Sequence, residues 1–257
     1  MRIDIALKEQ FNISRQKAKE LIENGKVTLN GKTVLKSSRE VSDCDVLKIK
    51  DFDILKYVSR GGLKLEKALD SFKINVDGLT CLDIGASTGG FTDCLLQKGA
   101  RRVFALDVGT SQLAESLRND ERVISMENTD IRNADIERVD FICMDVSFIS
   151  VTKVLYKAED LLKDKGKAVI LIKPQFEAGR EYLNKKGIVK DTKIHKRVIN
   201  AVVTCAKEVN LTPLGIDISP IKGGDGNTEY LLYLEKNSDT TAVLDFNTVI
   251  SKGALNK

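Results

Sequence analysis

Apolar and polar residues alternate in blocks along the second part of the chain. Four short apolar runs each lead into polar residues, in TCLDIG, RVFALDVG, VDFICMDVS and KAVILIKP. Helix-like stretches lie between them, namely GGFTDCLLQKG, SQLAESLRND and SVTKVLYKAEDLLKDKG. Strands that alternate with helices are typical of a mostly parallel, doubly wound α/β sheet. We therefore predict such a sheet from Thr80 onward, with strands that end at Asp83, Asp107, Asp145 and Lys173.

The residues that flank this sheet have patterns of their own. Residues 54–79 bend at Gly61-Gly62 and then predict a leading helix, with apolar residues at helical spacing: Leu65, Ala68, Leu69 and Phe72. A glycine-rich turn at 222–227 precedes a late alternating strand that begins at Glu229. Residues 237–257 form a polar tail in which no element is predicted.

The first part of the chain, residues 1–53, predicts a small α+β domain. Ser14 is a plausible N-cap for a helix that Gly25 ends. KVTLNGKTV predicts a hairpin around Asn30-Gly31, and DVLKIK predicts a third strand.

The net positive charge of the chain is concentrated in its first 60 residues. Residues 1–60 hold 13 Lys and Arg against 9 Asp and Glu, whereas the remainder is balanced at 28 of each. A localised basic region favours an anionic partner such as RNA, although a solvated charged face has the same composition. The candidate RNA-binding residues are Arg15, Lys17, Lys19, Lys26, Lys32, Lys36, Arg39 and Arg60.

Composition narrows the class of protein. The chain is 42% hydrophobic and 30% charged, without an apolar run of membrane-spanning length or an export signal at its start, so we expect a cytoplasmic protein with no membrane insertion. The five scattered cysteines favour reduced thiols and no metal site. Trp is absent and aromatic residues make up 5%, so base-stacking surfaces are not expected to be prominent. The sequence does not indicate which oligomeric state the protein has.

A glycine-rich turn follows the first strand of the predicted sheet, in CLDIGASTGGFTDCLL. Its GASTGG does not match the G-x-G-x-x-G of dinucleotide-binding proteins, and Asp83 before it would repel phosphate. A carboxylate there suits the cationic S-adenosylmethionine, with Asp107 toward the ribose and Asp130 toward the adenine. An ordinary tight turn and a nucleotide site are the alternatives. The candidate cofactor-binding residues are Asp83, Gly85, Ser87, Thr88, Gly89, Gly90, Phe91, Asp107, Asp130 and Asp145.

Two lysines and two carboxylates are predicted at the same rim of the sheet, namely Lys64, Asp145, Lys173 and Glu229. Each alone is most simply an ion pair at a strand end. Together they resemble the Lys-Asp-Lys-Glu tetrad of the FtsJ-like ribose 2′-O-methyltransferases, and all four positions match.

Longer motifs resemble the TlyA family over nearly the whole chain. They are YVSRGGLKL, DIGASTGGFTDCLL, ALDVGTSQLAESLRNDERV, DVSFIS, IKPQFEAG and IKGGDGNTEY, while SRQKAKELIENGKVTLNGK with DVLKI resembles the small S-four-type RNA-binding domain. The resemblance implies that this domain precedes a Rossmann-like class I methyltransferase domain at residues 80–236.

The same resemblance implies an enzyme that methylates the 2′-oxygen of cytidine in 16S or 23S ribosomal RNA, with ribosomal RNA or ribosomal subunits as partners. The family is historically also described as haemolysins. A membrane-active protein and a non-catalytic RNA-binding assembly factor are therefore the alternative functions.

Within the tetrad we expect Lys173 to be the general base. A lysine accepts a proton only in its neutral form, which burial and the neighbouring Lys64 favour and which Asp145 and Glu229 oppose. The carboxylates would orient the lysines, and Lys64 would stabilise the developing alkoxide.

Other reactive side chains have ordinary interpretations. His195, the only histidine, is expected on the surface or half-buried on an amphipathic helix, and Cys81 and Cys143 are expected in the core. The loop YLNKKGIVKD either contacts RNA or is a plain surface loop, and its basic residues are Lys185, Lys186 and Lys190.

Overall fold

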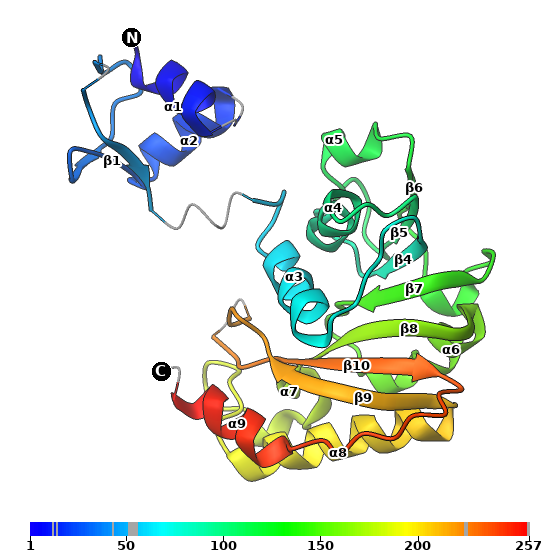
Figure 1. Cartoon of the computed structure of the whole chain (residues 1–257). Coiled ribbons are helices and arrows are strands. Elements are labelled where there is room, and N and C mark those ends of the chain that lie inside the picture. The colour runs from blue at the N-terminus through cyan, green and yellow to red at the C-terminus, as the bar shows by residue number, and fades with distance from the viewer. Residues whose placement is uncertain (12, 14, 43, 51–55, 224–225, 256–257) are drawn as a thin grey trace. The chain divides into compact units, whose positions relative to one another are not determined.

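The computed structural model describes residues 1–11, 13, 15–42, 44–50, 56–223 and 226–255 (Figure 1). Contacts divide the chain into two units, Met1–Lys56 and Tyr57–Lys257, and each unit has its own core. The predicted cap at Ser14 lies outside the described residues.

The first unit packs two helices against a small antiparallel sheet. The helices are α1 (Ile3–Phe11) and α2 (Arg15–Glu23), and the strands β1 (Val27–Leu29), β2 (Lys32–Val34) and β3 (Leu47–Ile49) have the order β2-β1-β3. Asn30 (φ 50°) and Gly31 (φ 80°) form the tight turn between β1 and β2, as the sequence predicts. The third predicted strand is also confirmed, as β3.

The second unit is built on a seven-stranded sheet of order β6-β5-β4-β7-β8-β10-β9. Its strands are β4 (Thr80–Ile84), β5 (Arg102–Leu106), β6 (Val123–Met126), β7 (Val139–Met144), β8 (Leu162–Ile172), β9 (Leu211–Ile218) and β10 (Tyr230–Lys236). The first five are parallel, and β10 is antiparallel to both of its neighbours. The chain leaves β4 first toward β5 and later returns beside it as β7, so the ends of β4, β5 and β7 form the switch point where such sheets bind ligands.

Helices cover both faces of this sheet (Figure 1). One core contains α3 (Gly61–Phe72), α4 (Gly90–Gln97) and α5 (Glu115–Arg118), and the other contains α6 (Leu155–Leu161), α8 (Thr192–Glu208) and α9 (Phe246–Leu255). Alternate strand residues feed the two cores: Cys81 and Cys143 lie in the first, Leu82 and Ile142 in the second. Both cysteines are buried in strands, as predicted. No helix within the described ranges is long and apolar enough to cross a bilayer.

Three segments differ from their sequence predictions. Only Glu115–Arg118 of SQLAESLRND is α-helical, and Ser111 before it has a left-handed backbone (φ 56°). Residues 162–166 continue into β8 instead of ending the preceding helix, with a register shift opposite Val139–Phe141. The polar tail contains α9, whose Val249 and Ile250 are buried in the core beside α8.

Candidate active site

Four charged side chains meet at the carboxyl edge of the large sheet. Nζ of Lys64, on α3, lies 2.7 Å from Oε2 of Glu229 and 3.4 Å from Oδ2 of Asp145. Nζ of Lys173, at the end of β8, lies 2.6 Å from Oδ1 of Asp145. Asp145 follows β7 and Glu229 precedes β10, so the topology brings together residues that lie up to 165 positions apart.

This tetrad is largely withdrawn from solvent. Lys64, Lys173 and Glu229 are 8%, 7% and 2% exposed. Burial opposes the charge on Lys64, but Asp145 and Glu229 outweigh burial and raise the pKa of Lys64 above its ordinary value. Lys64 is therefore a fixed positive charge at neutral pH.

Ser147 and Gln175, which the sequence analysis did not single out, also contact the tetrad. Lys173 donates a hydrogen bond to Oγ of Ser147 (2.7 Å), and Nε2 of Gln175 donates to Oε1 of Glu229 (3.3 Å). Pro174 is the first residue of the short helix α7 (Pro174–Glu177), where its missing N–H costs nothing, and β8 ends at Ile172, directly before Lys173. The motif IKPQF thus places Lys173 and Gln175 directly after the end of the strand.

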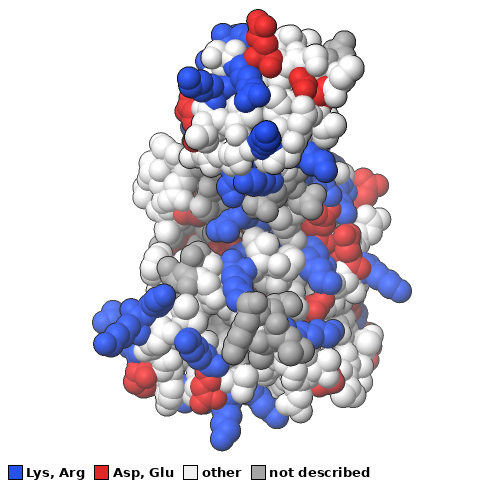
Figure 2. Space-filling model, turned by 90° about the vertical axis from the view of Figure 1, so that its left-hand side faces the viewer, with Lys and Arg blue, Asp and Glu red and all other residues white. Residues whose placement is uncertain are grey.

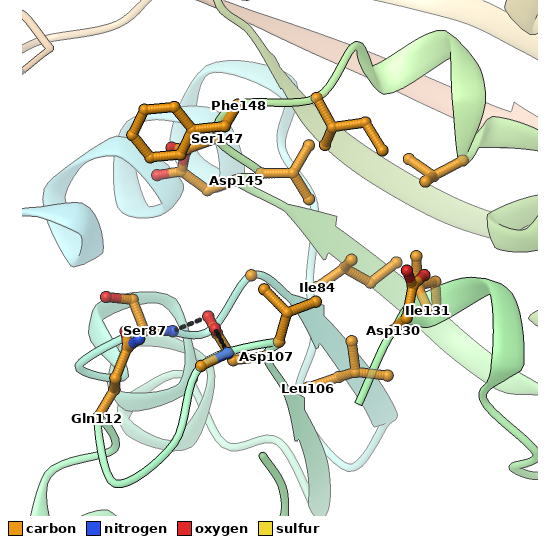
Figure 3. A pocket seen from close by; sticks show the side chains of 16 residues that line it. Ile84, Ser87, Leu106, Asp107, Gln112, Asp130, Ile131, Asp145, Ser147 and Phe148 are labelled. Carbon is orange, nitrogen blue, oxygen red and sulfur yellow. Dashed lines mark hydrogen bonds between the residues drawn. The ribbon is translucent and has the colours of Figure 1, made fainter. Parts of the chain in front are cut away.

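A hollow of about 460 Å³ opens beside the tetrad (Figure 3). We call it the first hollow; of the predicted cofactor-binding residues it is lined by Gly85, Ser87, Asp107, Asp130 and Asp145. Asp107 accepts hydrogen bonds from the amides of Ser87 (2.8 Å) and Gly109 (2.7 Å). Arg132 holds the pKa of Asp130 down at about 2, so this carboxylate is ionised.

The charge of the first hollow fits a cationic ligand. Its lining contains three aspartates and, among the described residues, neither Lys nor Arg. A phosphate group would meet repulsion there, whereas S-adenosylmethionine carries a sulfonium and an ammonium and no phosphate. The residues present therefore fit S-adenosylmethionine.

The glycine-rich turn is shaped by close contacts. Gly85 has φ 86°, and a Cβ there would lie 2.7 Å from the carbonyl oxygen of Asp145. Gly89 has φ 98°, and a Cβ there would lie 2.3 Å from Leu117 of α5. Gly85 thus lets the turn approach the tetrad, while Gly89 serves packing and lines neither hollow described here.

A second hollow, of about 300 Å³, meets the first at the tetrad. Both are lined by Gly85, Ser87, Asp145 and Ser147, and the second adds the predicted residues Thr88, Gly90 and Phe91. Lys64 and Lys173 also line the second hollow, as do Arg60 and Lys222. Asp145 and Ser147 therefore lie where a ligand in one hollow would approach a ligand in the other.

Phe148 stands at the rim of the first hollow (Figure 3). It is 92% exposed and has a left-handed backbone (φ 64°), which is uncommon for a bulky residue. Its ring lies 5.2 Å from that of Phe176, whose ring in turn lies 5.7 Å from Nζ of Lys173. The low aromatic content gave no sign of this exposed ring; the only signal is its place three residues after Asp145.

Asp83 does not line either hollow, which differs from its prediction as a cofactor contact. Its carboxylate is fully buried, and Oδ2 accepts hydrogen bonds from the amide (2.9 Å) and the hydroxyl (2.7 Å) of Thr92. Asp83 thus holds the first turn of α4 behind the glycine-rich turn, and Oδ1 has no hydrogen-bond partner in the described part of the chain.

This burial has a consequence for stability. Burial, opposed by Thr92 and reinforced by Asp145, raises the pKa of Asp83 to about 7 from 3.8. Because the folded state holds this proton more tightly, the stabilisation is complete below pH 3.8 and is lost as the pH rises toward 7. The free energy of unfolding should therefore fall as the pH rises, and we expect Asp83→Asn to remove roughly 4 kcal/mol of this fall.

Urea unfolding of the ligand-free protein between pH 4 and pH 8 measures this effect. Asp135→Asn, which changes an exposed carboxylate, serves as the control and should keep the wild-type slope. An unchanged slope in Asp83→Asn as well would show that Asp83 is ionised throughout.

The basic residues of the first unit are mostly exposed. Arg15 forms an ion pair (2.9 Å) with the buried Asp4, so its guanidinium has a structural partner. Lys19, Lys26, Lys32, Lys36 and Arg39 are exposed, and nothing is described of the Lys17 side chain. Figure 2 shows Lys and Arg side chains on the surface of both units, with acidic ones among them. Arg60 belongs to the second unit and lines the second hollow.

His195 is more buried than predicted, at 6% exposed. Its ring lies between the hydroxyl of Tyr230 (2.7 Å) and the carbonyl of Val189 (2.9 Å), and burial lowers its pKa. The neutral ring holds the 184–190 loop against α8 and β10, which is a structural role. Asn227 reinforces this loop, since its side chain binds the carbonyl of Gly187 and the amide of Val189. The loop lysines, Lys185, Lys186 and Lys190, are exposed.

Comparisons with known proteins agree with this geometry. Residues 57–236 match the FtsJ-like methyltransferase family model, and residues 1–47 match the S4 domain. The fold and the site thus define an S-adenosylmethionine-dependent methyltransferase with an S4 domain at its N-terminus.

Within that class, the chain belongs to the family of the TlyA methyltransferases. It is 43% identical over 230 residues to the 16S/23S rRNA (cytidine-2′-O)-methyltransferase TlyA of Mycobacterium tuberculosis, covering 88% of this chain and 86% of that protein. It is 45% identical over 237 residues to hemolysin A of Brachyspira hyodysenteriae, covering 88% and 95%. A solved structure described as a "putative hemolysin from Streptococcus thermophilus" is 40% identical, with a TM-score of 0.77 over 100% of this chain and 97% of that one.

Proposed function

We propose that this protein transfers a methyl group from S-adenosylmethionine to the 2′-oxygen of cytidine in ribosomal RNA. The observation that carries the proposal is the tetrad at the junction of two hollows, of which the first fits the cofactor. The S4 match and the activity named for the M. tuberculosis relative support ribosomal RNA as the substrate. Ribosomal subunits would be the partners, and the enzyme would work in the cytoplasm, where they are found.

The contacts of Lys64, Lys173 and Asp145 support the roles that we assign to them. Lys64 contacts two carboxylates and keeps its charge, so it is suited to stabilise a developing alkoxide. Lys173 contacts one carboxylate and a hydroxyl, and we assign it as the base. Asp145 lies between the two lysines and would fix the position of both Nζ atoms.

When bound, S-adenosylmethionine would supply an electrophilic methyl group on a positively charged sulfur, which would keep the electron pair of the carbon–sulfur bond. The 2′ O–H bond would break as its proton moves to Nζ of Lys173 in its neutral amine form, and the oxygen would form the new bond to the methyl carbon. Phe148, exposed at the rim, offers a ring on which an unstacked base can lie.

Transfer of labelled methyl groups to purified ribosomal subunits tests this function. We expect incorporation into 16S or 23S RNA, and mapping of 2′-O-methyl groups should locate it on cytidine. Absence of label from both RNAs, with intact and naked RNA alike, would reject the proposal. The same preparation and a tetrad-inactive variant, applied to liposomes, distinguish the haemolysin alternative: leakage independent of the tetrad would favour a membrane function.

A further inference from the structure

The two hollows have opposite charge. The first is lined by three aspartates, whereas the second is lined by one aspartate and four cations: Arg60, Lys64, Lys173 and Lys222. Lys64 and Lys173 are buried and paired with the tetrad carboxylates. Arg60 and Lys222 are exposed, and neither has an ion-pair partner in the part of the chain that the structure describes. The second hollow thus has two cations available to a ligand.

These two cations come from different elements. Arg60 immediately precedes α3, four residues before Lys64, and Lys222 lies in the connection from β9 to β10, seven residues before Glu229. Both side chains border the hollow that contains the tetrad lysines. A ligand with two separated negative charges and a neutral centre would match this lining, because its centre could meet Lys173 while its ends meet Arg60 and Lys222.

A nucleotide within an RNA strand has this distribution of charge. Its ribose is neutral and carries one phosphate on the 5′ side and one on the 3′ side, so a 2′-oxygen at Lys173 leaves both phosphates nearby. We propose that Arg60 and Lys222 bind the two phosphates that flank the ribose to be methylated. This inference rests on the proposed function, and it makes Arg60 and Lys222 positioning residues that act through phosphate contacts.

Neutral variants test the proposal. Arg60→Met and Lys222→Met keep the aliphatic length and remove the charge, and Lys207→Met changes an exposed lysine of α8 that lines neither hollow. Binding of the ribosomal RNA substrate and methylation kinetics are measured for each between 50 and 200 mM salt, a range chosen because phosphate contacts depend on salt.

We expect each hollow variant to weaken RNA binding about fivefold near 0.15 M salt and to reduce the slope of log affinity against log salt by about 0.7 to 0.9. The double variant should lose both contacts, with a slope smaller by about twice that amount. Saturating RNA should restore kcat, and the KM for S-adenosylmethionine should stay at the wild-type value. Lys207→Met should match the wild type in every respect.

Three results would overturn the proposal that Arg60 and Lys222 bind the flanking phosphates. They are an RNA affinity and salt slope equal to those of Lys207→Met, a lower kcat with unchanged RNA affinity, and a raised KM for the cofactor. Failure of the wild-type protein to methylate RNA would instead reject the proposed function, so the two failures are distinguishable.

Discussion

Replacement of Lys173 by alanine should lower kcat for methyl transfer by about 10³-fold, within the range of general-base contributions. The expected loss is large because Nζ of Lys173 lies against both Asp145 and Ser147, where the two hollows meet, and in its neutral form it would take the proton of the ribose. Affinity for S-adenosylmethionine should change little, since Lys173 does not line the first hollow. Asp145 keeps Lys64 at 3.4 Å, so the variant does not leave a buried carboxylate without a cation.

Two further variants test whether Lys173 acts as a base or only through its positive charge. Lys173→Arg keeps the positive charge, but a guanidinium stays protonated at any working pH, so the arginine variant should be as inactive as the alanine variant. Lys167→Ala removes a lysine from the same strand, six residues earlier, and should keep full activity. Single-turnover rates measure methyl transfer, and calorimetric titration measures the affinity for S-adenosylmethionine. Substantial activity in Lys173→Arg would mean that Lys173 acts only through its charge.

The strands of the parallel sheet and two members of the tetrad could be predicted because their signals are local, whereas the full tetrad followed from the family resemblance. The four predicted strands are mainly apolar runs that lead into polar residues, and the carboxyl ends of parallel strands share one edge of the sheet. This rule alone places Asp145 and Lys173 together. The hairpin at Asn30-Gly31 followed from a turn that two residues specify.

The features that sequence analysis missed depend on packing. Asp83 has the position expected of a cofactor contact, yet Thr92, nine residues later, binds its carboxylate within the protein. The helix α9 is short and follows a polar stretch, and its apolar residues gain stability only against α8. Lys222 looked like any loop lysine, because its place beside the tetrad depends on the return of β10 next to β8.

Replacement of Lys64 by methionine should abolish methyl transfer and also destabilise the fold. Glu229 is 2% exposed and has Lys64 as its ion-pair partner at 2.7 Å. Among the described residues, the variant therefore leaves this buried carboxylate with the side-chain amide of Gln175 as its remaining side-chain hydrogen-bond partner. Loss of one partner from a buried pair costs about 3 to 5 kcal/mol in unfolding free energy. Urea unfolding at pH 7.5 measures this loss, at a pH where the raised pKa of Lys64 keeps this lysine protonated.

A double-mutant cycle with Glu229→Gln separates stability from activity. Glutamine has the shape of glutamate and no charge, so Lys64→Met/Glu229→Gln should recover most of the lost unfolding free energy. Glu229→Gln alone should cost less than Lys64→Met, because Lys64 keeps Asp145. Methyl transfer should stay absent in the double variant, since it lacks Lys64, the cation to which we assign stabilisation of the alkoxide. If the double variant is as unstable as Lys64→Met, then Lys64 stabilises the fold through packing of its aliphatic chain and not through its charge.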